Sequence, residues 1–131
     1  MVDDLIGQRL GQYQIIEEIG RGGMATVYRG IQTSVNREVA IKVILPQYAN
    51  SPDFIRRFEI EAELVARLEH PHIVPLFDYW REVDSTYLVM RLLRGGTLKD
   101  AIDEQLSLDQ IASILDQITA ALHIAHRTGV V

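Results

Sequence analysis

The chain has 131 residues, 47% of them hydrophobic and 24% charged, a balance typical of one folded domain and not of a disordered chain. It contains no cysteine, which excludes disulfides and thiolate metal sites, and no apolar run approaches the roughly 18 residues of a membrane span. The net charge of −5 gives no support for nucleic-acid binding, and the first residues lack the basic and apolar regions of a signal peptide.

The first third of the chain is predicted to form three β-strands. Tyr13–Ile19 is rich in strand-forming residues and ends at the glycine cluster Gly20–Gly23, and Thr26–Ile31 follows as a second strand. The two strands are therefore expected to form a hairpin with a glycine-rich connection. Arg37–Leu45 is the third strand, and its inner run from residue 39 to 44 is apolar except for Lys42.

A helix is predicted next. Ser51 is a suitable N-cap and Pro52 is favourable at the first helical position. The helix is expected to run to about Glu69 and to end before Pro71, because the residue before a proline is disfavoured in helical conformation.

Two further strands are predicted near Ile73–Trp80 and Thr86–Leu92, after which the Gly95-Gly96 pair breaks the chain. Thr97 is then expected to cap a short helix, and a Ser107–Gln110 capping box to start a long one. Apolar residues recur at helical spacing along the long helix: Ile111, Ile114, Leu115, Ile118, Ala121, Leu122 and Ala125. This order indicates an α+β fold with a sheet-rich first part and a helical second part.

The glycine cluster fits the pattern G-x-G-x-x-[small]-x-V over Gly20–Val27. Such a loop can offer its backbone N–H groups to phosphate oxygens, although glycine-rich hairpin turns without a ligand are also common. A dinucleotide-binding loop would lead into a helix, and a Walker loop would need a Gly-Lys pair, which the chain lacks. A strand on both sides of the loop is what the protein kinase signature requires.

Lys42 lies inside an apolar strand, either as an edge lysine that reaches solvent or as a phosphate-binding lysine held by a carboxylate. The predicted helix supplies one such carboxylate, since Glu61 is the polar member of a stripe with spacings of 4, 3, 4 and 3: Phe54, Phe58, Glu61, Val65 and Leu68. Glu59 and Glu63 point about 160–200° away from that stripe. An inward carboxylate is costly unless paired, so we predict an ion pair between Lys42 and Glu61 that leaves the ammonium group available to phosphates.

Five motifs in this order resemble the protein kinase family, and within it the bacterial eukaryotic-like (Hanks-type) serine/threonine kinases, from about residue 13 to residue 131. The motifs are Gly20-x-Gly22 with Val27; Val39-Ala40-Ile41-Lys42; Glu61, nineteen residues after Lys42; His70-Pro71-His72-Ile73-Val74; and Tyr87-Leu88-Val89-Met90. The resemblance implies a kinase-like N-lobe, with a five-stranded antiparallel sheet plus helix C, followed by the first helices (D and E) of an incomplete C-lobe. The expected organisation is an N-terminal extension over 1–12, the N-lobe and hinge over 13–93, and the start of the C-lobe over 94–131, truncated before the catalytic loop.

The resemblance also implies ATP as the cofactor and assigns roles to single residues. The loop over the phosphates is expected to consist of Gly20, Arg21, Gly22, Gly23, Met24 and Ala25. Lys42 is expected to contact the α- and β-phosphates and to pair with Glu61 as the catalytic lysine–glutamate pair. The adenine contacts implied are Val27 and Ala40 as the roof, Met90 as the gatekeeper, and the backbones of Arg91 and Leu93 as the hinge.

Two positions depart from the usual pattern of the family. Ala25 stands in place of the third glycine, and since alanine does not adopt positive φ freely, we expect a stiffer loop. Arg91 stands where glutamate is common, with little expected effect because the hinge uses backbone atoms there.

The segment His126-Arg127-Thr128 is not interpreted as the catalytic His-Arg-Asp triplet, because it lies in the last turn of the predicted long helix. Residues 125–131 match the lead-in to the catalytic loop. The sequence therefore lacks the base aspartate and the ligands that would bind Mg²⁺ in the full-length enzyme, and no metal ligand is assigned to this chain. We expect no phosphotransferase activity from this chain alone.

An exposed apolar stripe on the final helix is expected to cause self-association or formation of a homodimer. Protein substrates are implied for the full-length enzyme, in the cytoplasm or in the cytoplasmic part of a larger, membrane-anchored protein. The alternative is a non-catalytic, kinase-like regulatory or dimerisation module. The coding sequence after residue 131 would discriminate between these two interpretations.

Overall fold

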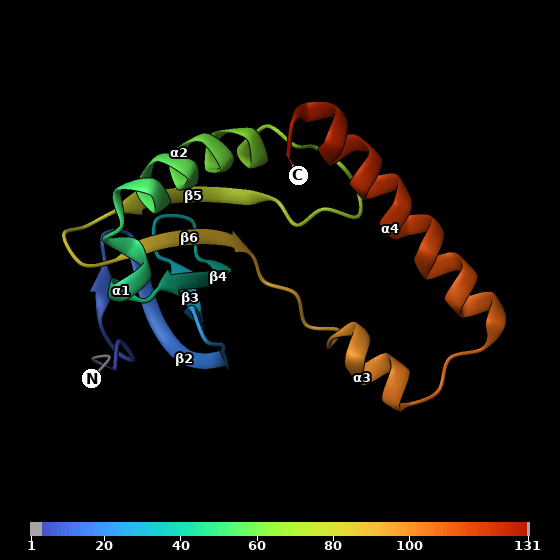
Figure 1. Ribbon diagram of the computed structural model, residues 1–131. Coiled ribbons are helices and arrows are strands. Elements are labelled where there is room, and N and C mark those ends of the chain that lie inside the picture. Colours follow the sequence, from blue (N-terminus) through green and yellow to red (C-terminus); the bar gives the residue numbers. More distant parts are fainter. Residues whose placement is uncertain (1–3, 131) are drawn as a thin grey trace.

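The computed structural model describes residues 4–130, which form a curled antiparallel sheet with one helix packed along it and two further helices beyond (Figure 1). The strands are β1 (Arg9–Leu10), β2 (Tyr13–Arg21), β3 (Ala25–Gln32), β4 (Arg37–Ile44), β5 (Leu76–Arg81) and β6 (Thr86–Arg91). The helices are α1 (Pro46–Ala49), α2 (Pro52–Ala66), α3 (Leu98–Asp103) and α4 (Leu108–Thr128). The predicted α+β class and the order of the long elements are confirmed.

The sheet has six strands in the order β1-β2-β3-β4-β6-β5, where the sequence predicted five. The additional strand is β1, which lies in the segment expected to be an N-terminal extension. Gly11, at a φ of 58°, turns the chain so that Leu10 pairs with Tyr13 and Arg9 with Gln14. This segment thus adds an edge strand to the sheet.

Two predicted boundaries were wrong, each for a local reason, and one short helix was not predicted. Helix α2 ends at Ala66 and not near Glu69, since the N–H of Arg67 already bonds the Leu64 and Val65 carbonyls in a tightened last turn. Strand β5 begins at Leu76 and not at Ile73. The N–H of Ile73 donates to the His70 carbonyl in a turn, and Pro75 has no N–H to donate to a ladder. The four-residue helix α1, which starts at Pro46, was not predicted.

The main core lies on one face of the sheet. Its buried members are Tyr13, Ile15, Tyr28, Val39, Ile41, Val43, Tyr87 and Val89. Trp80 is stacked between two tyrosines of this cluster, with ring centroids 5.7 Å from Tyr13 and 4.9 Å from Tyr87. Alternate residues of β4 supply three of the core members, so the residues between them, Lys42 included, point to the other face.

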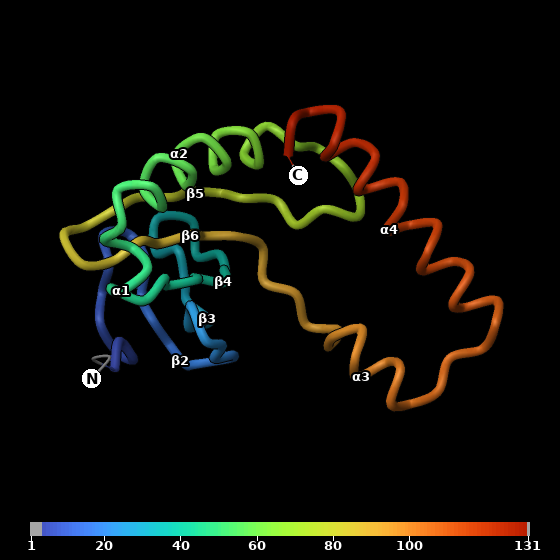
Figure 2. The backbone as a smooth tube through the Cα atoms, viewed as in Figure 1, coloured from blue at the N-terminus to red at the C-terminus, as the bar shows by residue number. Residues whose placement is uncertain are grey.

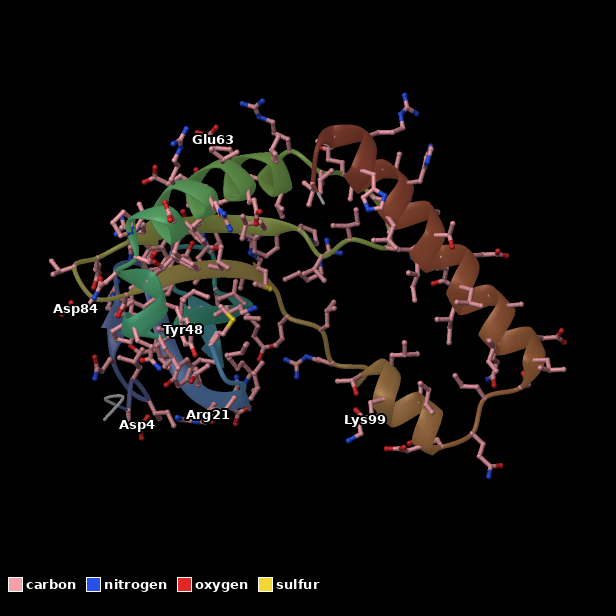
Figure 3. All side chains as sticks on the ribbon, viewed as in Figure 1. Asp4, Arg21, Tyr48, Glu63, Asp84 and Lys99 are labelled. Carbon is pink, nitrogen blue, oxygen red and sulfur yellow. The ribbon has the colours of Figure 1, made fainter. Side chains whose placement is uncertain are left out.

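Helix α2 packs against the sheet through aromatic rings. The Phe58 ring is stacked on Phe54, with centroids 5.9 Å apart, and meets the edge of Tyr79 in β5 at 6.0 Å. Ser51 caps the helix, as predicted, by accepting a hydrogen bond from the Phe54 N–H. Glu63 lies on the helix surface that faces away from the sheet, as its helical phase predicted (Figure 3).

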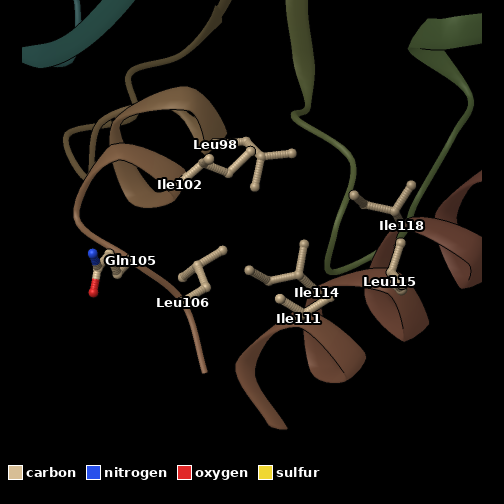
Figure 4. Close-up of a pocket in the computed structure, with 8 residues that line it drawn as sticks. All are labelled: Leu98, Ile102, Gln105, Leu106, Ile111, Ile114, Leu115 and Ile118. Atoms are coloured by element: carbon tan, nitrogen blue, oxygen red, sulfur yellow. The ribbon is translucent and has the colours of Figure 1, made fainter. Parts of the chain in front are cut away.

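Helices α3 and α4 extend away from the sheet, and Figure 2 traces the chain leaving β6 for α3 and returning along α4. The predicted cap at Thr97 and the predicted Ser107–Gln110 capping box are both present, and Asp100 completes a second capping box with Thr97. Between the two helices lies an apolar groove of about 580 Å³ (Figure 4), lined by residues that include Leu98, Ile102, Leu106, Ile111, Ile114 and Ile118. The predicted stripe on α4 is exposed; whether copies of the chain associate through it stays a prediction. Within residues 4–130, no helix has the length and apolar character needed to cross a bilayer.

The hydrogen bond between Tyr13 and Asp78 leads to a pH prediction. The Tyr13 hydroxyl donates to Asp78 Oδ2 at 2.9 Å, and burial, followed by this bond, raises the pKa of Tyr13 from 10.0 to about 12. Below pH 10 the phenol is protonated in both the folded and unfolded states. Between pH 10 and about 12 the folded state retains a proton that the unfolded state has lost, so the free energy of unfolding falls as the pH rises.

The variant Tyr13→Phe should lose stability less steeply than the wild type between pH 10 and pH 12. Burial also raises the pKa of Tyr28 and of Tyr87, and both groups remain in the variant, so the difference between the two proteins isolates Tyr13. Urea denaturation at a series of pH values measures this. Equal slopes for the two proteins would contradict the prediction.

Candidate functional site

The register of the sheet brings most of the predicted site residues to one face. Val27 in β3 is paired with Lys42 in β4, and Lys42 is paired with Leu88 in β6. One register step away, Ala40 is paired with Met90. Residues that are directly opposite, or two apart along a strand, share a face of a sheet, so these five side chains form two adjacent rows opposite the main core.

The glycine hairpin is tighter than predicted. Gly20 and Arg21 belong to β2, and Ala25 opens β3, so that only Gly22–Met24 forms the turn. The turn closes through a hydrogen bond of 2.9 Å from the Gly22 N–H to the Ala25 carbonyl. Three of the six residues expected in the loop over residues 20–25 therefore belong to strands, because cross-strand pairing continues as far as Arg21 and Thr26.

The turn leaves backbone donors free. Among the hydrogen bonds of the described residues, none uses the N–H of Gly23 or Met24. Neither Gly22 nor Gly23 has a positive φ, and an added Cβ at Gly23 would meet no atom within 4 Å. The glycines of this turn therefore do not serve to allow a positive φ. Their effect is that no side chain covers the backbone N–H groups. Ala25 is buried in β3 and does not have a positive φ. The stiffer loop was expected because alanine avoids positive φ, but the backbone does not require a positive φ at this position.

The Arg21 side chain turns back to its own strand. Its guanidinium donates two hydrogen bonds to the Glu18 carboxylate, at 2.9 and 2.8 Å. The hydrogen bond with Arg21 is also the largest cause that lowers the pKa of Glu18. In this conformation the Arg21 side chain is engaged with Glu18.

Glu61 lies over the face that carries Lys42. Together with Leu88 and Met90, it lines a cavity of about 250 Å³ between α2 and the strands β5 and β6. The predicted ion pair, however, is not formed: residues 4–130 contain four ion pairs within 4.0 Å, and none joins Lys42 to Glu61. The reason is that Glu61 is exposed. Burying an unpaired carboxylate costs free energy, but a carboxylate that stays hydrated avoids this cost and does not need a cationic partner. The roles of both residues stay predictions.

The segment predicted as the hinge begins at the end of β6. Arg91 is the last residue of that strand, and its N–H donates to the Pro75 carbonyl at 3.2 Å. Leu93 lies beyond the strand and is 61% exposed, and its N–H donates to no acceptor among the hydrogen bonds of the described residues. Met90, which is half-buried and lines the cavity, directly precedes this segment in β6.

Two features of this region were missed by the sequence analysis. Leu88 is paired with Lys42 across β4 and β6. Because residues two apart in a strand share a face, the assignment of Met90 to the site could have indicated Leu88 as well. A network of alternating charges, Glu17–Arg29–Glu38–Arg94, lies on the same face. Its members come from four separate stretches of the chain, so no local pattern in the sequence indicates it.

Comparison with known proteins shows similarity along almost the whole chain. The family model of the protein kinase domain matches residues 13–131. The serine/threonine-protein kinase PrkC of Bacillus subtilis is 43% identical over 130 residues, covering 97% of this chain and 20% of that protein. PknD of Mycobacterium tuberculosis, also a serine/threonine-protein kinase, is 38% identical over 127 residues, covering 95% of this chain and 19% of that protein.

Solved structures agree with the sequence comparison. The crystal structure of the Mycobacterium tuberculosis PknI kinase domain superposes with a TM-score of 0.84 at 27% identity, covering 94% of this chain and 51% of that one. A cysteine-to-alanine variant of the same domain superposes with a TM-score of 0.86. The chain thus spans about a fifth of the length of its curated relatives and about half of this solved domain.

Proposed function

The chain belongs to the protein kinase family, and from this premise we propose that it is the ATP-binding portion of a serine/threonine protein kinase. Such an enzyme transfers the γ-phosphoryl group of ATP to serine or threonine side chains of proteins. The observation that carries the proposal is the shared sheet face of Val27, Ala40, Lys42 and Met90, with the glycine turn at one end and the segment after β6 at the other.

The residues present are suited to hold ATP. Val27 and Ala40 offer small apolar side chains that would cover the adenine ring, and the exposed backbone near Leu93 offers an N–H to its edge. The free N–H groups of Gly23 and Met24 would donate to phosphate oxygens. Lys42 takes part in none of the four ion pairs within residues 4–130, so its ammonium group is available to the phosphates.

The residues proposed to hold ATP are not sufficient to transfer its phosphoryl group. Transfer depends on metal ions that neutralise phosphate charge and on a group that positions the nucleophile. The described residues contain no group of three or more acidic or histidine side chains that could hold a metal ion, so we assign no step to Mg²⁺. We propose that these 131 residues bind ATP without transferring its phosphoryl group.

The test is a titration with a fluorescent ATP analogue. Lys42→Ala should weaken binding about tenfold or more, because it removes the cation that we propose for the phosphates, at about 1.4 kcal/mol per factor of ten. The matched control is Lys99→Ala, the same substitution at the chain's other lysine, on α3 (Figure 3). The control should bind like the wild type. Equal affinities of all three proteins, or no binding by the wild type, would refute the proposal.

The same variant tests the absence of transfer. Radiolabel passed from ATP to the chain itself, or to a general protein substrate, should not exceed the background measured with Lys42→Ala. Transfer above that background would show that catalysis does not need the motifs missing from this sequence.

A further inference from the structure

Four charged side chains form a continuous chain of alternating sign. Arg29 donates from Nε to Glu17 at 2.9 Å and from Nη1 to Glu38 at 3.2 Å. The other oxygen of Glu38 accepts a hydrogen bond from Arg94. Each of Arg29 and Glu38 therefore contacts two partners of opposite charge, so the network holds Glu38 from both sides.

The network borders the proposed adenine site. Arg29 is paired with Ala40 across β3 and β4, and Glu38 lies two residues before Ala40 on the same strand, hence on the same face. Glu17 is paired with Arg29 and extends the row into β2. The charges thus occupy the register positions next to the apolar roof, at the end of the sheet from which the chain leaves β6.

Arg94 lies in the linker 92–97, which connects β6 to α3. Its bond to Glu38 is the one side-chain hydrogen bond, within residues 4–130, that joins anything after β6 to the sheet. The remaining side-chain hydrogen bonds beyond residue 91 are local to α3 and α4, as with Thr97 and Asp100. The backbone hydrogen bonds of that part outside the regular helix ladders are local as well.

We propose that Glu38 and Arg94 form a latch that holds the linker 92–97 against the sheet and thereby positions its backbone for the adenine edge. The second half of this statement rests on the proposed ATP binding; the first half does not. Both residues are positioning residues, since they act through the linker backbone at Leu93.

The surroundings of Glu38 favour this role. The Arg94 hydrogen bond is the largest cause, ahead of Arg29, that lowers the pKa of Glu38, so the carboxylate stays charged under ordinary conditions. An isolated ion pair on the surface contributes little to stability, because two long side chains lose conformational freedom to make one contact. Here Arg29 and Glu17 already restrain Glu38, so Arg94 alone must be ordered when the latch closes.

The latch is tested by backbone ¹⁵N relaxation of the full chain. In the wild type, the amides of 92–96 should give order parameters of about 0.85, and Arg94→Ala should lower them toward about 0.6 while the sheet stays rigid. Lys99→Ala, which removes one positive charge from the first turn of α3 without breaking an ion pair, should leave them unchanged. Unchanged order parameters in Arg94→Ala would overturn the latch.

A double-mutant cycle separates the pair from its individual members. Glu38→Gln should loosen the linker as Arg94→Ala does, and the double variant should be no looser than either single variant. Arg94→Lys, which keeps the charge, should restore most of the rigidity. Additive effects of the two single substitutions would overturn the pairing.

Nucleotide titration tests the positioning. Arg94→Ala should weaken binding of the fluorescent ATP analogue about two- to fivefold, with recovery in Arg94→Lys. A loosened linker with unchanged affinity would overturn the positioning role. If the wild type binds no nucleotide, the proposed function and with it the positioning role fail, whereas the relaxation result still decides whether the latch exists.

Discussion

Replacing Ile41 by alanine is expected to lower the free energy of unfolding by about 2–5 kcal/mol, the range for deleting a buried aliphatic side chain. Ile41 is 0% exposed and lies in the middle of β4, paired with Tyr28 on one side and Val89 on the other. Core atoms from three adjacent strands therefore surround the cavity that the substitution would create. A loss of this size is a large fraction of the stability of an ordinary domain.

Urea denaturation of Ile41→Ala and of a matched control measures this effect. The control is Ile60→Ala, which makes the same chemical change at a position on α2 that is 55% exposed. The control should lose less than about 1 kcal/mol, because most of its side chain already contacts water. Similar losses in the two variants would show that Ile41 is not part of a packed core.

Gly30→Ala is expected to destabilise the sheet by about 1–3 kcal/mol through overpacking. A Cβ added at this buried glycine would lie 2.8 Å from Cδ1 of Ile41 and 3.0 Å from the Gln14 carbonyl oxygen. The isoleucine side chain can shift, but the carbonyl belongs to the neighbouring strand β2, so relief requires strands β2 and β3 to separate. Gly30 does not have a positive φ, and the cost is therefore one of space.

Gly23→Ala is the matched control for this second effect. It lies in the turn, has no positive φ, and its added Cβ would meet nothing within 4 Å. Its stability should stay within about 0.5 kcal/mol of the wild type. Thermal or urea unfolding of the two variants gives the comparison, and a Gly30→Ala protein as stable as Gly23→Ala would contradict the close approach of β2 and β3.

These effects bear on the candidate site because β4 serves both faces of the sheet. Val39, Ile41 and Val43 are buried in the core, while Ala40 and Lys42 between them face the proposed nucleotide. A substitution in the core is therefore expected to act on binding only through stability. Lys42→Ala, on the opposite face, is expected to act on binding with the core intact.

Much of the fold was accessible from local sequence patterns. The alternation in β4, the caps at Ser51, Thr97 and Ser107, and the glycine turn each depend on neighbouring residues, and all are present in the structure. The ends of α2 and β5 were misplaced because hydrogen bonds in the connection between them decide where regular structure stops. Such competition between a last helical turn and a loop leaves little trace in residue type.

The sequence by itself determined that neighbouring residues of a strand alternate between its two faces, so that Lys42 points away from the face of Ile41 and Val43. This follows from the two-residue period of a strand, which is a local property. Only the tertiary structure decided whether the charged groups meet. The helical period placed Glu61 over the sheet face that carries Lys42, yet Glu61 is exposed and forms no ion pair with Lys42. Cross-strand register and the path of the linker instead brought Glu38 to Arg94, because contacts between distant segments depend on how the elements are assembled.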